Sequence, residues 1–147
     1  MVILNMTIMR GILALDVGEA RIGTAVTPPG SFFVFGRETI VRSDICTDIQ
    51  TICNLANDEK ATLIVLGLPI RTDGKDSLQA KQIHSFAKAL SHKGFDLTFE
   101  DERYTSKLAS RHITRHNPNR KTKRDKGLID QVSAILILES FLERTKA

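Results

Sequence analysis

The chain has 147 residues, of which 41% are hydrophobic and 26% charged, and its formal net charge is +4. This is the composition of an ordinary folded protein, and we expect one domain spanning residues 1–147. No apolar run approaches the roughly 20 residues of a membrane span, and the first nine residues lack the pattern of a secretory signal, so we expect a cytoplasmic protein without membrane contacts.

Three strands are predicted in close succession near the N-terminus, over residues 11–16, 21–27 and 32–40. Each is a short, mainly apolar run, and the connections are so short that neighbouring strands are expected to be antiparallel. Pro28 ends the second strand, because proline donates no hydrogen bond to a sheet ladder.

A helix is predicted after Asp44, whose side chain can cap the first turn. Both cysteines, Cys46 and Cys53, fall in this helix seven positions apart. That spacing is roughly 10 Å along the axis and too long for a disulfide, so we expect two reduced thiols in the core. The apolar face that helical spacing predicts consists of Ile45, Ile49, Ile52, Cys53 and Ala56.

The rest of the chain predicts strands that alternate with helices. Residues 61–68 are continuously apolar, as in a strand covered on both faces, and we place them at the centre of the sheet. A helix follows from a capping box that begins at Asp76, and it ends at Gly94. Residues 96–102 alternate between apolar and polar, which indicates an exposed edge strand. Two further helices are predicted over residues 107–116 and about 128–143.

This order of elements predicts an α/β fold with a mixed five-stranded sheet, in which three antiparallel strands are followed by parallel ones and helices flank the sheet. Right-handed crossovers make the later strands parallel to the first strand. The carboxyl ends of parallel strands gather at one edge of the sheet, which is the usual place for a functional site.

Three carboxylates stand where this fold would bring them together. Asp16 ends the first strand, Glu102 ends the fifth, and Asp130 begins the apolar stripe of the last helix. Each also has a purely structural alternative: Asp16 can bond its own turn, and the other two can cap helices. If the three converge, their oxygen atoms suit Mg²⁺ or Mn²⁺, and two ions could activate water and stabilise a leaving oxygen without a protein nucleophile.

Positive charge is concentrated between residues 103 and 126, where nine basic residues stand against one acidic residue. Such a segment suits a polyanion, because each neutralised phosphate releases counterions; the alternative is a solvated loop with no partner. Few aromatic residues are available for base stacking, which favours recognition of the nucleic-acid backbone. The candidate nucleic-acid-binding residues are Arg21, Arg103, Lys107, Arg111, Arg120, Lys121, Lys123 and Arg124.

Four ordered motifs resemble the YqgF/RuvX family, whose members are described as Holliday junction resolvases and as pre-16S ribosomal RNA nucleases. The resemblance implies a ribonuclease H-like fold and a metal site at Asp16, Glu102 and Asp130, with Asp101 as a possible substitute for Glu102. This chain departs from the family pattern at Thr27-Pro28, where a Ser-Asp pair is usual. The motifs are Leu15-Asp16-Val17-Gly18 with Arg21-Ile22-Gly23, Gly67-Leu68-Pro69 with Asp73-Gly74, Asp101-Glu102-Arg103 with Thr105, and Ile129-Asp130.

We therefore expect a hydrolase: a metal-dependent nuclease that uses Mg²⁺ or Mn²⁺, as two ions, to process the 5′ end of precursor 16S rRNA. RNA is favoured over branched DNA by the resemblance alone, and a pre-ribosomal particle is a possible partner. Alternatives are a Holliday junction resolvase, which needs a symmetric dimer for paired cuts, a non-catalytic nucleic-acid-binding module, and an actin-like phosphotransferase. The sequence is compatible with a monomer or a homodimer.

Overall fold

The computed structural model describes residues 10–69, 78–101 and 123–145. Its sheet has five strands in the order β3-β2-β1-β4-β5. β1 pairs with β2, and β2 with β3, in antiparallel fashion, whereas β1 with β4 and β4 with β5 are parallel. The predicted mixed sheet is confirmed. The strands are β1 (Gly11–Val17), β2 (Arg21–Thr27), β3 (Phe35–Val41), β4 (Ala61–Leu68) and β5 (Asp96–Asp101).

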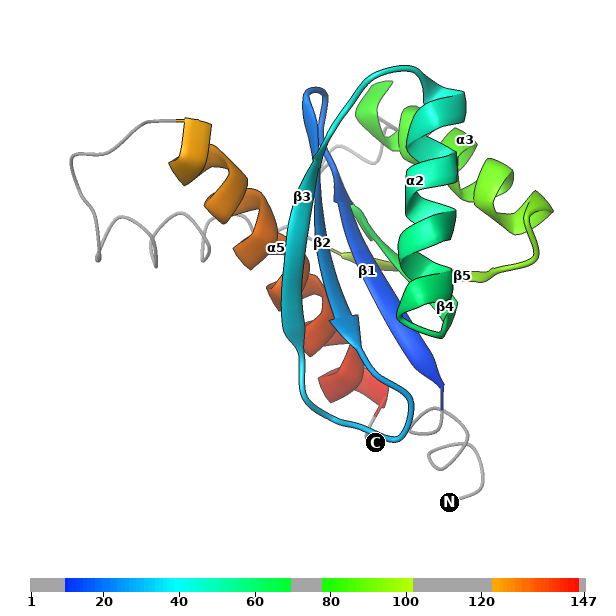
Figure 1. The fold of residues 1–147 in the computed structure, drawn as a ribbon, viewed down its shortest axis with the longest axis vertical. Coiled ribbons are helices and arrows are strands. Elements are labelled where there is room, and N and C mark those ends of the chain that lie inside the picture. The colour runs from blue at the N-terminus through cyan, green and yellow to red at the C-terminus, as the bar shows by residue number, and fades with distance from the viewer. Residues whose placement is uncertain (1–9, 70–77, 102–122, 146–147) are drawn as a thin grey trace.

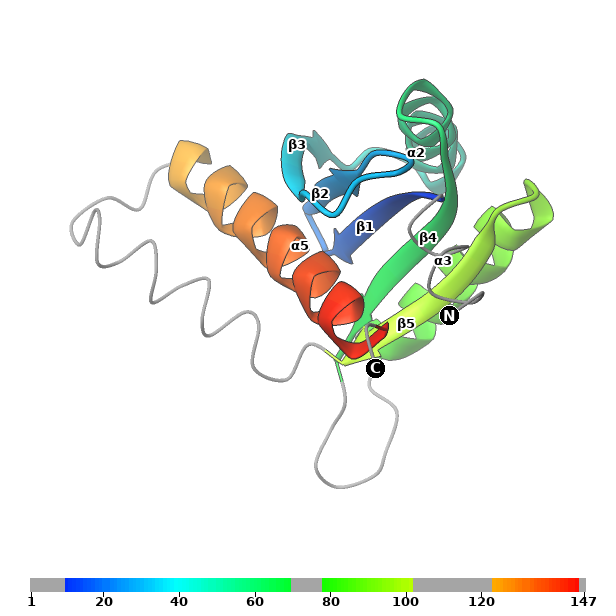
Figure 2. The same cartoon turned by 90° about the horizontal axis from the view of Figure 1, so that it is seen from below.

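Helices cover both faces of the sheet. α2 (Ile45–Asp58) and α3 (Leu78–His92) lie on one face, and α5 (Lys123–Thr145) crosses the other (Figures 1 and 2). Because neighbouring side chains of a strand point to opposite faces, β1 contributes to two cores. Leu13 and Leu15 pack into the core beneath α2 and α3, while Ile12 and Ala14 pack beneath α5.

The two interior parallel strands are buried on both sides. β4 sends Ile64 and Leu66 into the first core and Leu63 and Val65 into the second, as its continuous apolar sequence predicts. The middle position of the sheet nevertheless belongs to β1, with β4 beside it. β5 is an edge strand as expected, but its polar face is exposed only at Asp96, where the strand begins, and Glu100 near its end is 6% exposed.

Two elements begin at positions three or more residues away from the predicted ones. The third strand begins at Phe35 rather than at residue 32, because the chain first turns: the Ser31 N–H donates to the Pro28 carbonyl oxygen at 3.1 Å. The last helix begins at Lys123 rather than near residue 128. No helix in the three described segments is both long enough and apolar enough to cross a membrane.

Helix ends follow the predicted chemistry where they are described. The Asp44 side chain accepts a hydrogen bond from the Thr47 N–H at 2.8 Å, which caps α2. This bond favours the ionised form and lowers the pKa of Asp44. After α3 the chain leaves through Gly94, whose φ of 97° favours glycine. Asp76, the predicted start of that helix, lies outside the described residues.

The two cysteines have different environments, so the expectation of two core thiols is wrong for Cys46. Cys53 is buried and Cys46 is exposed. Cys46 lies in the first turn of α2, where an opening between α2 and α3 is lined by Ile45, Cys46 and Ala89, among others. Helical spacing placed both thiols on one face, but burial also depends on how far the neighbouring helix extends along that face.

Thiol labelling should separate the two cysteines. Burial raises the pKa of Cys53 from its ordinary value, so this thiol stays protonated as well as inaccessible. With a disulfide reagent near neutral pH we expect one rapid equivalent, from Cys46, and a second only after unfolding. Cys46→Ser should abolish the rapid phase. Rapid labelling of Cys53 in the folded Cys46→Ser variant would contradict this structure of α2.

α5 approaches the sheet closely because two glycines lie beneath it. A Cβ atom added at Gly23 of β2 would collide with the Asp130 carbonyl oxygen, and one at Gly36 of β3 would lie 2.7 Å from the Gln131 side chain. Gln131 also donates to the Arg37 carbonyl oxygen at 3.1 Å, and Thr39 donates to the Gly127 carbonyl oxygen at 2.9 Å. The first half of α5 is therefore seated on β2 and β3.

This seating makes Gly23 intolerant of a side chain. We expect Gly23→Ala to lower the free energy of unfolding by about 1–3 kcal/mol, because helix and strand backbones must separate to admit a methyl group. Gly127→Ala is the matched control, since its added Cβ would meet no atom nearer than 3.9 Å and alanine favours a helix. Chemical denaturation of both variants measures the difference, and equal stability would contradict the close approach.

Candidate active site

The carboxyl ends of β1, β4 and β5 lie at one edge of the sheet. Gly67 of β4 pairs with Glu100 of β5, and Leu66 pairs with Leu15, so Asp16 is level with Gly67 and Glu100. Asp16 is half-buried and follows Ile12 and Ala14 on the α5 face by strand alternation. At the end of the sheet where the sequence predicts the site, which we call the site edge, the middle strand β1 thus carries the carboxylate of Asp16.

Asp130 reaches the same face from the terminal helix. In the β1–β2 ladder Asp16 is paired with Gly23, and Gly23 lies directly beneath the backbone of Asp130. Paired residues of antiparallel strands have Cα atoms about 4.5–5.5 Å apart. Asp16 and Asp130 are far apart in the sequence, but both lie next to Gly23 in the structure. The hypothesis that they share a metal ion requires this proximity.

Arg21 contacts the second of these carboxylates. Its Nε atom donates to Oδ2 of Asp130 at 2.6 Å, and the two side chains are 31% and 20% exposed. Arg21 begins β2 on the α5 face, like Gly23 and Ala25. The predicted phosphate-binding arginine thus forms an ion pair with a predicted metal ligand.

The remaining predicted site residues are outside the part of the chain whose side chains are described. Lys123 and Arg124 form the start of α5, but their side chains are not described. Within the described side chains, no three His, Cys, Asp or Glu residues gather as a metal site. The residues that lie outside the described segments are Glu102, Arg103, Lys107, Arg111, Arg120 and Lys121.

The alternation of side chains along β5 indicates on which face of the sheet Asp101 lies. Leu97 and Phe99 pack towards the core beneath α2 and α3, and Glu100 bonds Arg144 of α5 on the other face. Alternation therefore assigns Asp101 to the face of Phe99, away from that of Asp16. This placement disfavours Asp101 as a ligand that shares an ion with Asp16.

The buried Glu100 is held by the end of the terminal helix. The Arg144 guanidinium donates three hydrogen bonds of 3.0–3.2 Å to the Glu100 carboxylate. It also lies over the Phe141 ring, with Cζ 5.6 Å from the ring centroid. Such a bidentate pair fixes orientation as well as charge. Glu100 thus joins β5 to α5 at the level of Asp16.

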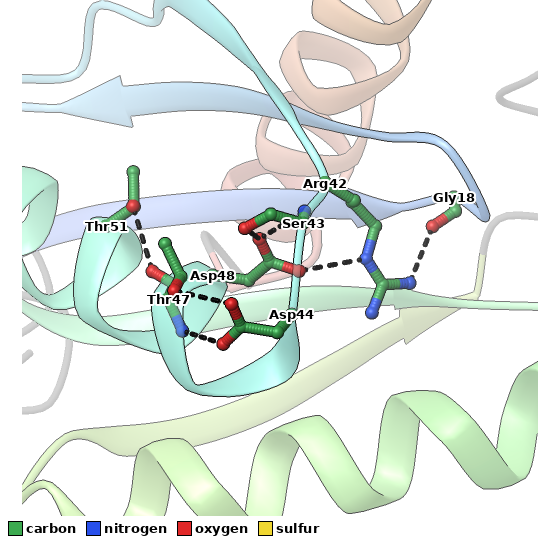
Figure 3. Close-up of polar contacts among 7 residues, drawn as sticks. All are labelled: Gly18, Arg42, Ser43, Asp44, Thr47, Asp48 and Thr51. Carbon is green, nitrogen blue, oxygen red and sulfur yellow. Dashed lines mark hydrogen bonds and ion pairs between the residues drawn. The ribbon is translucent and has the colours of Figure 1, made fainter.

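A second polar network fixes the turn that follows Asp16. Arg42 donates to the Gly18 carbonyl oxygen at 3.0 Å and to Oδ2 of Asp48 at 3.3 Å (Figure 3). Asp48 is 1% exposed, and its other oxygen accepts from the Ser43 N–H at 3.0 Å. The Arg42 guanidinium also lies over the Phe86 ring of α3. This network, which we call the Arg42–Asp48 clamp, ties the β1–β2 turn to both helices of the other face.

Comparison with known proteins identifies the family. Residues 10–144 match RuvX, which is described as Holliday junction resolvase. The chain belongs to the RuvX family. Its relatives include proteins named as proposed pre-16S rRNA nucleases. One from Thermus thermophilus is 40% identical and the match covers 89% of this chain and 96% of the relative. One from Synechococcus elongatus is also 40% identical, with 91% and 89% covered.

Solved structures show the fold of this RuvX chain. Thermus thermophilus RuvC, solved in complex with a Holliday junction substrate, has a TM-score of 0.58 at 8% identity and covers 94% of this chain and 97% of its own. The Fowlpox virus resolvase has a TM-score of 0.57 at 14% identity, with 93% and 99% covered. The expected ribonuclease H-like fold and family are confirmed, and the family and relatives support the expectation of a nuclease.

Sequence reasoning missed two of the polar groups that shape the RuvX site edge. The alternation of residues 96–102 predicts an exposed edge strand and therefore not a buried Glu100, and an acidic residue such as Asp48 in a first helical turn is favoured by the helix dipole whether or not it is buried. The same alternation puts Glu100 on the side of the strand opposite Leu97 and Phe99, and this is the signal in the sequence that separates it from the apolar face. Its arginine partner is 44 positions away, and no local pattern indicates the pairing.

Proposed function

We propose that this RuvX chain is a metal-dependent RNA endonuclease that processes precursor 16S rRNA. The observation that carries this proposal is the convergence of Asp16 and Asp130 on one face, at the edge where the parallel strands end. Ribosomal RNA is the substrate class favoured by the names of the relatives that match most of the chain.

The donor set fits a hard divalent cation. Asp16 and Asp130 supply carboxylate oxygens, the ligands that Mg²⁺ and Mn²⁺ prefer, and both side chains retain access to solvent. Glu102 is proposed as the third ligand, in preference to Asp101, because Asp101 belongs to the opposite face. Two bound ions would supply an activated water and neutralise the leaving oxygen. The chain's own residues hold the ions and orient the phosphodiester.

The substrate backbone is proposed to follow the basic residues between 103 and 126 towards the site edge. Lys123 and Arg124 begin α5, seven and six positions before Asp130, so the segment enters the helix that carries a proposed ligand. Because phosphate contacts release counterions, binding should weaken steeply with salt. This arrangement positions a nucleic-acid backbone without requiring base-specific contacts.

Parallel cleavage assays test the proposal. Purified protein with Mg²⁺ is incubated with a precursor 16S rRNA fragment and with a four-way DNA junction of similar length. We expect cleavage of the RNA near the mature 5′ end, loss of cleavage with chelator, and recovery when Mg²⁺ is restored. Undiminished cleavage in chelator would end the metal proposal. Cleavage of the junction but not of the RNA would show that the substrate is four-way DNA and not precursor rRNA.

Junction resolution is the second candidate, favoured by the description of the matching family. Paired, symmetric cuts require two active sites, so this candidate predicts a homodimer on the junction. Sedimentation of the complex separates the two candidates: one protomer per RNA supports processing, and two per junction support resolution. Salt-dependent binding with no cleavage of either substrate would instead indicate a non-catalytic binding module.

A further inference from the structure

The ion pair between Arg21 and Asp130 places a cationic side chain where the proposed function requires a metal ion. Its single 2.6 Å bond uses Nε of Arg21 and Oδ2 of Asp130. One guanidinium carries five N–H donors, so this bond leaves others for a second partner. One carboxylate has two oxygens, so Asp130 also has further acceptor capacity.

We propose that Arg21 is an exchangeable counter-ion: it neutralises Asp130 when no metal is bound, is displaced by the metal ion, and then pairs with a substrate phosphate. The inference rests on the proposed function, which it deepens by coupling metal binding to substrate binding. No bond is made or broken in this exchange beyond ion pairs and hydrogen bonds. The net effect is that one anionic partner of Arg21 replaces another.

A comparison within the molecule supports exchange rather than a permanent pair. Arg144 holds Glu100 through three hydrogen bonds, and the Glu100 side chain is only 7% exposed, although the Arg144 side chain is 56% exposed. The Asp130 side chain is 20% exposed and that of Arg21 is 31% exposed, so both can regain water during an exchange. The fixed pair joins β5 to the last turn of α5 through three hydrogen bonds, and the exchangeable pair lies at the proposed metal site.

Electrostatics give the exchange its direction. A divalent ion bound between Asp16 and Asp130 would lie close to the Arg21 guanidinium, and like charges at such distances repel. The guanidinium must therefore leave Oδ2 of Asp130 as the ion arrives. Because Arg21 starts β2 at the same sheet edge, its charge stays beside the site and suits a phosphate that the metal has brought in.

Metal binding to the full chain tests directly whether Arg21 and the metal ion compete for the Asp130 carboxylate. Mn²⁺ is titrated into wild type, Arg21→Gln and Arg21→Lys, and free Mn²⁺ is measured from its electron paramagnetic resonance signal. We expect Arg21→Gln to bind Mn²⁺ about fivefold more tightly, since a part-exposed ion pair no longer competes. Arg21→Lys should lie between the two, because it keeps the charge but loses the planar fork.

Two controls make the result specific. Arg10→Gln removes a similar ion pair, with Asp96, at the other end of the strands, and should leave Mn²⁺ affinity unchanged. In an Asp130→Asn background, Arg21→Gln should lose its effect, as a double-mutant cycle requires of a direct coupling. Circular dichroism of each variant confirms that the comparison is made on folded protein.

Release of Arg21 is measured with heparin, a polyanion that has no phosphodiester to cleave. Without metal, wild type and Arg21→Gln should show the same dependence of affinity on salt. With Mn²⁺, the slope for wild type should be steeper by about one unit, because one more cation contacts the polyanion. Equal slopes in both conditions would overturn the second half of the proposal.

The outcomes separate this inference from the proposed function. If wild type binds Mn²⁺ and Arg21→Gln binds it equally or more weakly, Arg21 is not a competitor and the inference fails while the metal site stands. If neither wild type nor any Arg21 variant binds Mn²⁺, the proposed function and the inference fail together.

Discussion

Asp16→Asn is expected to reduce cleavage of the precursor RNA by about a thousandfold or more, which corresponds to about 4 kcal/mol of lost transition-state stabilisation. Asparagine keeps the size of the side chain and one oxygen, but it removes the charge that a divalent ion needs. The effect should appear mainly in kcat. RNA affinity at a given salt concentration should be reduced by no more than the one phosphate contact that metal binding releases from Arg21, because the other proposed phosphate contacts come from basic residues that do not depend on the metal ion. Single-turnover cleavage and filter binding measure the two quantities.

The matched control for this prediction is Asp58→Asn. Asp58 is an exposed carboxylate at the end of α2, on the face of the sheet that the proposed site does not use. Its removal changes net charge by the same amount as Asp16→Asn and should leave cleavage unaltered. Equal loss in both variants would indicate a general charge effect, and full activity in Asp16→Asn would remove Asp16 from the metal site.

The second large effect is expected on stability, at the Arg42–Asp48 clamp. Asp48→Ala should lower the free energy of unfolding by about 3–5 kcal/mol, because it leaves the largely buried Arg42 guanidinium without its carboxylate. The Asp48 side chain is 2% exposed and that of Arg42 is 20% exposed. Asp48→Ala also leaves the Ser43 N–H without its acceptor. Urea denaturation followed by circular dichroism measures the loss.

Two further variants test the cause of that loss. Asp96→Ala breaks an ion pair whose Asp96 side chain is 72% exposed, and it should cost at most about 1 kcal/mol. Combining Asp48→Leu with Arg42→Met should recover much of the lost stability, since an apolar pair of similar volume avoids the unpaired charge. A loss in the double variant as large as that in Asp48→Ala would contradict this explanation.

The parts of the fold that were predictable depend on local chemistry. Residues 61–68 reveal a buried strand by their continuous apolar character, and Asp44 reveals a helix start because its side chain can accept from a free backbone N–H. The relative directions of the strands followed from connection lengths and crossover handedness. The position of β1 in the middle of the sheet was less accessible, since it requires knowing on which side of β1 the β4 strand pairs.

The candidate site was predictable to the extent that topology alone brings residues together. Asp16 could be placed at a strand end, and Asp130 on the apolar stripe of a helix, from periodicity. Their proximity also depends on Gly23, whose missing side chain lets α5 approach β2, and a sequence does not show which helix crosses above a glycine. The Arg21–Asp130 pair was missed for the same reason: its members are 109 positions apart.

The division of the proposed ligands between β1 and α5 has a consequence for biosynthesis. A nascent chain that has emerged from the ribosome only as far as β5 contains the whole sheet and Asp16, but it lacks the helix that carries Asp130. Such an intermediate would be unable to assemble the proposed metal site. A nuclease whose proposed substrate is the precursor of a ribosomal component would thus stay inert until its final helix is released and docks.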